Sequence, residues 1–392
     1  MSDIVILSAT RTPIASFQGG LASVPASRLG ATAIKGALAQ AGLAPAGVTD
    51  VLLGNVLQAG QGQAPARQAA IHAGLPQSAR AVTIHKVCGS GLQAVMQAAH
   101  SLHAGVGTLF VAGGMENMSQ SPYLLPKARD GYRMGHGQII DSMIHDGLWD
   151  PYNNVHMGHC GEKCAAKYAF TREQQDAFAI ASFQRANAAQ KDGRFAAEIT
   201  AVEITDAKGN TTKVEHDEGP AKVKYDKIPQ LKPAFQKDGT ITPANASSIN
   251  DGAAALVVTT AAHAAAIGLK PLARLVSFGA HAQDPVWFTT APVQAAQNAL
   301  DRAGWKAADV DLWEVNEAFA VVPMAFMHEL GVAHDKLNVH GGAIALGHPI
   351  GASGARILVT LIHALRQRGL KRGVAAICIG GGEGLAACVE LL

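Results

Sequence analysis

The chain has 392 residues, of which 48% are apolar, 5% aromatic and 16% charged. This composition is typical of a soluble globular protein with a large core, and it excludes a disordered or fibrous chain. Lysine and arginine number 32 against 30 aspartates and glutamates, so the chain lacks the basic field of a nucleic-acid binder. We expect a small-molecule partner, and a local basic patch for a phosphate-bearing ligand is left open.

The N-terminus runs from Met1-Ser2-Asp3 directly into a strand-like segment at 4–7, which leaves no room for a signal peptide. The sequence has no apolar run of the roughly 18 residues that a membrane span needs. We therefore expect a cytoplasmic protein with no membrane partner. The five cysteines are unevenly spaced and odd in number, which favours reduced thiols over a disulfide framework.

Short β-branched runs alternate with alanine-rich helical stretches in the first third of the chain. In chain order, the patterns predict a strand at 4–8, a helix at 29–41, strands at 51–53 and 82–87, a helix at 92–102 and a strand at 109–112. The C-terminal part repeats this rhythm. Such alternation is typical of a layered α/β fold.

A faint internal repeat divides the chain into two halves. Residues 37–42 resemble residues 299–304, and each segment leads to a strand that ends near an asparagine, Asn55 or Asn316. The strand and glycine turn at 110–114 likewise echo those at 377–381. The repeat predicts two copies of one α/β unit, formed by residues 1–120 plus 250–270 and by residues 271–392.

The intervening stretch, residues 121–249, breaks this rhythm because it is richer in charge, histidine, methionine and tyrosine. Within it, Thr171 and Gln174 have the spacing of a capping box, which predicts a helix from there to about Lys191. We interpret the stretch as an inserted domain that covers a ligand or joins subunits.

Cys88 lies in a Cys-Gly-Ser-Gly turn between a predicted strand and a predicted helix. A helix N-terminus is expected to lower the pKa of the thiol, and the two glycines let a substrate carbonyl approach the backbone amides. A buried structural cysteine is the common alternative. The glycine-serine-glycine flank favours a reactive thiol.

His348 and Cys378 lie in two further glycine-rich turns. His348 has glycine and proline on either side and precedes a predicted helix at 357–365. Cys378 ends an apolar strand predicted at 374–377 and precedes three glycines, so backbone N–H groups beside its sulfur could hold an anionic oxygen. Taken singly, each has a structural alternative, a solvated histidine or a core cysteine. Together with Cys88 they indicate a covalent active site.

Nine ordered segments of the chain together resemble the thiolase family, and the resemblance covers nearly the full length. They are Thr10-Arg11-Thr12-Pro13, Val87-Cys88-Gly89-Ser90-Gly91-Leu92, Gly113-Gly114-Met115-Glu116-Asn117-Met118-Ser119, His156-Met157-Gly158, Asn245-Ala246-Ser247, Asn250-Asp251-Gly252-Ala253-Ala254, Asn316-Glu317-Ala318-Phe319, Gly347-His348-Pro349-Ile350-Gly351 and Cys378-Ile379-Gly380-Gly381-Gly382.

The resemblance implies a five-layered αβαβα core built from two similar α/β halves, with a loop domain inserted at 121–249. It also implies a homotetramer, a dimer of dimers joined through a loop similar to residues 125–135, for which a solvated charged loop is the alternative. The implied reaction is a reversible Claisen condensation between coenzyme A (CoA) thioesters, which joins two acetyl-CoA molecules into acetoacetyl-CoA. A degradative 3-ketoacyl-CoA thiolase of fatty-acid β-oxidation, acting on longer chains, is the alternative.

The same resemblance gives each catalytic residue a role. Cys88 is the nucleophile, because a thiolate is a good nucleophile toward a thioester carbonyl and also a good leaving group from the resulting acyl-enzyme. His348 accepts its proton, and Cys378 removes or returns a proton at the acetyl methyl carbon. His348 and a water on Asn316 hold the enolate oxygen, while the backbone amides of Cys88 and Gly380 hold the oxygen of the tetrahedral intermediate.

The resemblance further implies contacts to the pantetheine arm and acyl group, with no metal and no cofactor, since the CoA thioesters are substrates. These contact residues are Leu148, His156, Met157, Phe235, Ala246, Ser247, Ala318 and Phe319. Two positions depart from the family pattern. The usual arginine after an Asp-Glu pair is absent after Glu218, and Lys222 or Lys224 is expected to replace its contact with the nucleotide end of CoA. Residues 287–292 stand where many acetoacetyl-CoA thiolases carry a methionine-glycine segment, and the bulkier Phe288 is expected to reshape the acyl or pantetheine pocket.

Three other interpretations concern the cysteines. Cys160 and Cys164 near His156 and His159 could suggest a metal site, but a second ligand pair is missing from the sequence. Paired thiols could support redox chemistry, although the chain has no Cys-x-x-Cys motif. A non-enzymatic lipid-binding or scaffolding relative is expected to lack a catalytic residue, and the sequence retains all of them.

Overall fold

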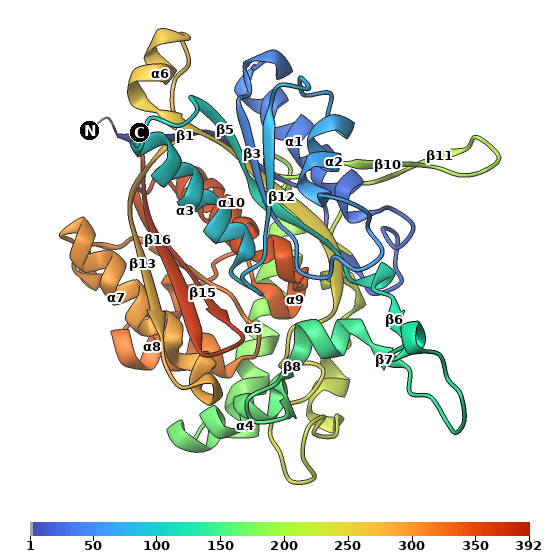
Figure 1. Ribbon diagram of the computed structural model, residues 1–392. Helices are drawn as coiled ribbons and strands as arrows, with labels where there is room; N and C mark the ends of the chain where they lie inside the picture. The colour runs from blue at the N-terminus through green and yellow to red at the C-terminus, as the bar shows by residue number, and fades with distance from the viewer. Residues whose placement is uncertain (1–2) are drawn as a thin grey trace.

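The two halves of the chain fold into strands and helices in the alternating order that the sequence predicts (Figure 1). The computed structural model describes residues 3–392. The first half forms β1 (Ile4–Arg11), β2 (Ala15–Ser16), α1 (Ala26–Ala41), β3 (Asp50–Gly54), α2 (Pro65–His72), β4 (Arg80–Ile84), α3 (Ser90–His103), β5 (Leu109–Asn117), β12 (Asn250–Thr260) and α6 (Ala261–Ala266). The second half forms β13 (Ala273–Ala282), α7 (Ala291–Ala303), β14 (Leu312–Val315), α8 (Val321–Leu330), α9 (Ala343–Leu346), α10 (Ile350–Arg368), β15 (Arg372–Ile379) and β16 (Glu383–Leu391).

Shorter elements fill the stretch between β5 and β12. They are β6 (Tyr123–Leu124), β7 (Ile140–Asp141), β8 (Trp149–Asp150), β9 (Val155–His156), α4 (Met157–Tyr168), α5 (Arg172–Lys191), β10 (Val202–Thr205) and β11 (Thr211–Val214). The predicted capping box is present, because the Thr171 side chain accepts a hydrogen bond from the N–H of Gln174, and α5 follows it. The β6–β7 region and the β10–β11 hairpin both project from the body of the molecule (Figure 1).

One ten-stranded sheet runs through both halves in the order β14-β15-β16-β13-β1-β12-β5-β3-β4, with β2 paired to β12. The halves join where β1 pairs with β13, placing Ile4 opposite Leu275 and Ile6 opposite Ala273. On its other side, β1 pairs with β12 over most of its length. The sheet is therefore continuous across the boundary between the two repeated units.

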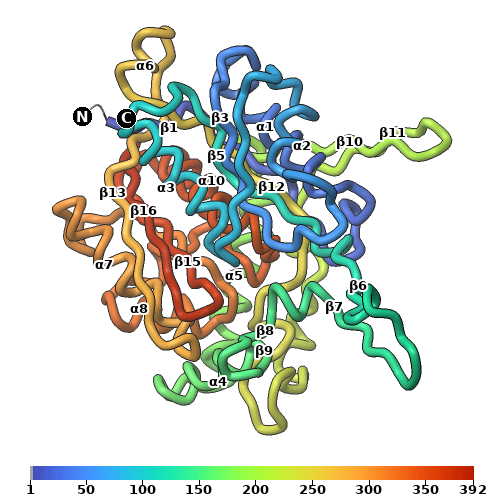
Figure 2. The backbone as a smooth tube through the Cα atoms, in the orientation of Figure 1, coloured from blue at the N-terminus to red at the C-terminus, as the bar shows by residue number. Residues whose placement is uncertain are grey.

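Three apolar clusters separate five layers. One cluster packs α1 and α2 against the outer face of the first-half strands, and a second packs α7 and α8 against the outer face of the second-half strands. The third surrounds α3 and α10, which lie between the two sets of strands (Figure 2). The predicted αβαβα layering is confirmed. Among the helices of residues 3–392, none has the length and apolarity that a membrane crossing requires.

Three details expected from the sequence are wrong. The strand expected at 82–87 ends at Ile84, and the helix expected at 357–365 begins earlier, at Ile350. The expected echo of 110–114 and 377–381 is also misaligned, since the glycines at 113–114 lie inside β5 and those at 380–381 follow β15. A Cβ on Gly114 would lie 2.0 Å from the Gly351 carbonyl oxygen, so the backbone of the second half crosses β5 here.

Candidate active site

Cys88 occupies the turn between β4 and α3, and the backbone is strained beside it. Val87 has φ +43°, a left-handed conformation that is costly for a β-branched residue. The hydroxyl of Ser90 holds the turn, accepting a hydrogen bond from the Lys86 N–H (2.8 Å) and donating one to the Val87 carbonyl (2.6 Å). Cys88 is half-buried there and lines a cavity.

Gly89 and Gly91 bring the second half of the chain against this turn. A Cβ on Gly89 would lie 2.4 Å from Cδ1 of Ile379, and one on Gly91 would lie 2.7 Å from the backbone N of Ala355. Those neighbours belong to β15 and α10. The glycines are therefore needed for close packing of the two halves, in addition to any access they give to substrate.

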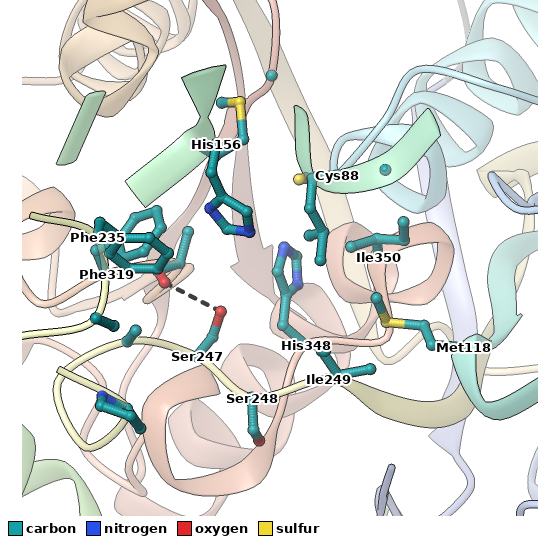
Figure 3. A pocket seen from close by; sticks show the side chains of 18 of the residues that line it. Cys88, Met118, His156, Phe235, Ser247, Ser248, Ile249, Phe319, His348 and Ile350 are labelled. Carbon is teal, nitrogen blue, oxygen red and sulfur yellow. Dashed lines mark hydrogen bonds between the residues drawn. The ribbon is translucent and has the colours of Figure 1, made fainter. Parts of the chain in front are cut away.

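His348 lies between α9 and α10 and is 5% exposed. A hydrogen bond of 2.6 Å joins its Nδ1 to Oγ of Ser353, and its backbone N–H donates to Oδ1 of Asn250 (3.0 Å). Nε2 has no hydrogen-bond partner among the described residues, and the ring lies beside Cys88 at the cavity (Figure 3). Burial, and then the charge of Arg356, lower the pKa of His348 to about 3. The ring is neutral and able to accept a proton.

Cys378 lies near the end of β15 and is fully buried. Burial raises the pKa of its thiol well above the ordinary value, and the nearby Cys88 raises it further. Two residues later, Gly380 lines the cavity, and its N–H faces the sulfur of Cys88. The three glycine-rich turns therefore meet at one place, as the sequence predicts.

The predicted lowering of the Cys88 pKa is wrong. Burial raises the pKa of this thiol to about 11, and the backbone N–H groups of Gly380 and Cys88 offset only part of that effect. The buried carboxylate of Glu116 raises it further. The resting pair is a neutral thiol beside the neutral ring of His348, an arrangement that allows a proton to pass from the thiol to the imidazole.

An apolar cavity of about 330 Å³ opens in front of Cys88 and His348. Of the predicted contact residues, all except the two lysine candidates, Lys222 and Lys224, line it, namely Leu148, His156, Met157, Phe235, Ala246, Ser247, Phe288, Ala318 and Phe319. Most come from the inserted stretch, and the last three come from the second half. The cavity is therefore built jointly by the insertion and the core.

Aromatic rings form one wall of this cavity. His156 stacks on Phe235 with 4.7 Å between ring centroids, and Phe319 meets Phe235 edge to face at 6.0 Å. Phe288 packs edge to face on Phe319 at 6.4 Å and is only 3% exposed. Beside the wall, the Ser247 hydroxyl donates a hydrogen bond to the Ala318 carbonyl (Figure 3). Phe288 thus lines the cavity next to Phe319.

Lys222 lies away from the cavity lining. Its ammonium group donates to Glu218 (2.7 Å) and to the hydroxyl of Ser16 (2.8 Å). Asn316 follows β14 and is fully buried, and neither polar atom of its side chain has a partner among the described residues. Such unpaired buried amide atoms are typical of a site that holds an ordered water.

Sequence reasoning missed three apolar residues that line the cavity near Cys88, namely Met118, Ile249 and Ile350. They pack with Val56, Leu57 and Met143. Met118 and Ile350 lie inside two of the family-like segments, and this position in the sequence could have identified them as site residues. Ile249 had no signal of its own.

Cys160 and Cys164 are buried, and the sulfur of each contacts one protein oxygen. The Sγ of Cys160 is 3.7 Å from Oδ2 of Asp150, and that of Cys164 is 3.9 Å from the Val321 carbonyl oxygen. Over residues 3–392, no three histidine, cysteine or acidic side chains are arranged to hold a metal ion. All five cysteines are free thiols.

A thiol, a neutral imidazole and a backbone N–H at the end of an apolar cavity are the groups that a cysteine-dependent acyl transfer requires. Sequence comparison agrees with this class. The family model for the thiolase N-terminal domain matches residues 4–262, and the family model for the thiolase C-terminal domain matches residues 269–391. The chain belongs to the thiolase family.

Curated relatives and solved structures extend this match over the whole chain. The acetyl-CoA acetyltransferase of Pseudomonas aeruginosa is 52% identical over 98% of both chains, and that of Cupriavidus necator is 52% identical over 100% of both. The crystal structure of the Bacillus anthracis acetyl-CoA acetyltransferase has a TM-score of 0.97 at 40% identity, covering 100% of this chain and 99% of that one. Acat5 thiolase from Ascaris suum, in complex with coenzyme A, has a TM-score of 0.93 at 43% identity over 100% of both.

Proposed function

We propose that the chain is an acetyl-CoA C-acetyltransferase, which condenses two acetyl-CoA molecules into acetoacetyl-CoA and CoA and catalyses the reverse cleavage. The observation that carries this proposal is the unpartnered Nε2 of His348 beside Cys88, at the end of a cavity partly lined by aromatic rings. It is supported by relatives named acetyl-CoA acetyltransferase that are 51–52% identical to this chain over nearly its full length. The enzyme is an acyltransferase, and its chemistry needs no cofactor besides the CoA thioesters themselves.

In the acylation step, the sulfur of Cys88 attacks the carbonyl carbon of acetyl-CoA while its proton passes to Nε2 of His348. The backbone N–H groups of Cys88 and Gly380 stabilise the negative oxygen of the tetrahedral intermediate. The carbon–sulfur bond to CoA then breaks. The CoA sulfur takes the proton from His348 and leaves the acetyl group on Cys88.

Cleavage of acetoacetyl-CoA uses the same groups with one addition. Cys88 attacks the 3-keto carbon, its proton moves to His348, and the bond to the neighbouring methylene carbon breaks. The leaving enolate takes a proton from Cys378, which suits a thiol that burial keeps neutral. A water on Asn316 and the protonated His348 stabilise the enolate oxygen meanwhile. Condensation is the reverse sequence.

A comparison of acyl-chain lengths tests this function. The protein should cleave acetoacetyl-CoA with a kcat/KM at least about tenfold above that for a long-chain 3-ketoacyl-CoA, because the bulky ring of Phe288 lines the cavity. Phe288→Ala should reduce this preference by about tenfold. Steady-state assays of acetyl-CoA release measure both values.

Phe278→Ala is the matched control, because Phe278 packs against His100 and is not among the residues that line the cavity. This variant should keep the preference of the parent chain. A higher kcat/KM for the long-chain substrate in the unmodified protein would support the degradative alternative instead.

We propose that the enzyme is a homotetramer joined through the β6–β7 region. Large apolar side chains in this projecting region are exposed, including Tyr123 (68%), Met134 (99%) and Ile139 (69%). Exposed apolar groups gathered in one segment are typical of a protein interface. The double variant Met134→Asp/Ile139→Asp should halve the mass measured by light scattering, and an unchanged mass would contradict this interface.

A further inference from the structure

Two buried glutamates hold the segment that carries His348, one at each end. The segment runs from residue 342 to residue 351, through α9 and into α10. Glu317 follows β14 in the second half, and Glu116 lies near the end of β5 in the first half. Both side chains are 0% exposed, so each carboxylate lies inside the protein next to the segment.

Glu116 holds the C-terminal end of the segment. Its Oε2 accepts hydrogen bonds from the backbone N–H of Gly351 (2.9 Å) and of Val56 (3.0 Å). Its Oε1 accepts from the amide of Asn55 (2.7 Å) and from the Leu57 N–H (3.2 Å). One carboxylate therefore ties the first turn of α10 to the loop after β3.

Glu317 holds the N-terminal end of the same segment. Its Oε2 accepts from the Ile344 N–H (3.1 Å) and from the hydroxyl of Ser182 (2.7 Å), and its Oε1 accepts from the amide of Asn338 (2.8 Å). A Cβ on Gly342 would lie 2.3 Å from Cδ of Glu317. The carboxylate and the backbone are in such close contact that the segment has little freedom to shift at this end.

The hydrogen-bond partners of both glutamates are neutral amides and a hydroxyl, without a cation among them. Burying a carboxylate this way is unfavourable, and burial raises the pKa of Glu116 to about 7. An apolar side chain could fill the same space at lower cost but could not accept the N–H groups of Gly351 and Ile344. The carboxylates supply acceptors at two fixed points on either side of His348.

We propose that Glu116 and Glu317 are positioning residues that fix Nε2 of His348 against Cys88. They act through the backbone N–H groups of Gly351 and Ile344 and not through contact with substrate. The assignment rests on the proposed role of His348 as the base. A glutamine at either position would keep the volume but place an NH₂ group or a single acceptor where the carboxylate now accepts several hydrogens.

A double-mutant cycle tests the proposal. Glu116→Gln and Glu317→Gln are each made in the full-length enzyme and in its His348→Ala variant, and the rate of Cys88 acylation by acetyl-CoA is measured in a single turnover by mass spectrometry. Each glutamine variant should lower that rate by about tenfold or more when His348 is present, and by less than about twofold when it is absent. The loss disappears in the second background because no imidazole is left to misplace.

Glu162→Gln is the matched control. Glu162 is also a buried glutamate (4% exposed) that accepts backbone N–H groups, those of Thr240 and Ile241, but it holds the inserted domain. Any effect of this variant should be the same factor in both backgrounds. Equal losses in both backgrounds for Glu116→Gln and Glu317→Gln would overturn the proposal.

The cycle also separates the two hypotheses. If His348→Ala alone leaves the rate of acylation unchanged, His348 is not the base. The positioning proposal then fails as well, because the glutamates would have no catalytic imidazole to position. If His348→Ala slows acylation while the glutamine variants do not, only the positioning proposal fails. Circular dichroism identifies glutamine variants that do not fold. In their place, Glu116→Asp or Glu317→Asp enters the same cycle, because aspartate keeps the carboxylate on a shorter side chain.

Discussion

Replacing Cys88 with alanine should lower kcat for acetyl transfer by at least about 10⁴-fold. Without the thiol, the protein has no nucleophile lining the end of the cavity that can form the acyl-enzyme, because burial keeps the thiol of Cys378 protonated. The assay is release of CoA from acetyl-CoA, together with intact-protein mass spectrometry. Cys88→Ala protein incubated with acetyl-CoA should gain no acetyl group.

Cys388→Ala is the matched control for this experiment. Cys388 is a fully buried free thiol of the second half that lies in β16 and is not among the cavity-lining residues. Its variant should keep activity within about twofold of the parent and lose only stability. Peptide mapping that finds the acetyl group of the parent enzyme on Cys378 would reverse the roles assigned to the two thiols.

Replacing Cys378 with alanine should separate the two half-reactions. Cys88, His348 and the Gly380 N–H are unchanged in this variant, so acetyl-CoA should still acetylate Cys88 at a rate near that of the parent. Formation and cleavage of the carbon–carbon bond should fall by about 10³-fold, because no acid or base is left to move the methyl proton. Single-turnover acetylation and steady-state acetoacetyl-CoA cleavage measure the two effects.

The decisive comparison is between the two rates in one preparation of Cys378→Ala. A normal rate of acetoacetyl-CoA cleavage would show that another group, or water, moves the proton. A parallel loss of both rates would show that Cys378 supports the Cys88 turn instead of the proton transfer. A variant that keeps its thermal unfolding temperature makes either result interpretable.

Local patterns in the sequence predicted the elements and the turns of the site. Cys88, His348 and Cys378 were identifiable because glycines surround each of them, and six of the contact residues that line the cavity lie in the quoted family-like segments, namely His156, Met157, Ala246, Ser247, Ala318 and Phe319. These signals are local, since a turn or a helix start depends mainly on its own residues. The layer order followed from the resemblance to the thiolase family, with which the internal repeat agrees.

Properties that depend on burial could not be predicted in this way. The pKa of Cys88 is raised and not lowered because neighbouring elements exclude water, which the turn itself does not reveal. Lys222 forms an ion pair with Glu218, four residues earlier, and this pairing competes with any contact between Lys222 and the nucleotide end of CoA. The sequence pattern alone does not reveal that competition. The hydrogen bond from Gly351 to Glu116 joins residues 235 positions apart. The roles of the site residues, the nucleotide contact and the cytoplasmic location stay predictions.

The shared central layer has a consequence for how activity arises during folding. Helix α10 is buried along its first sixteen residues, from Ile350 to Leu365, because it packs on strands of both halves. Neither half alone can shield that helix or bring His348 to Cys88. Catalytic competence therefore requires the two halves to be docked, so acetyl transfer reports their docking rather than the folding of either half alone.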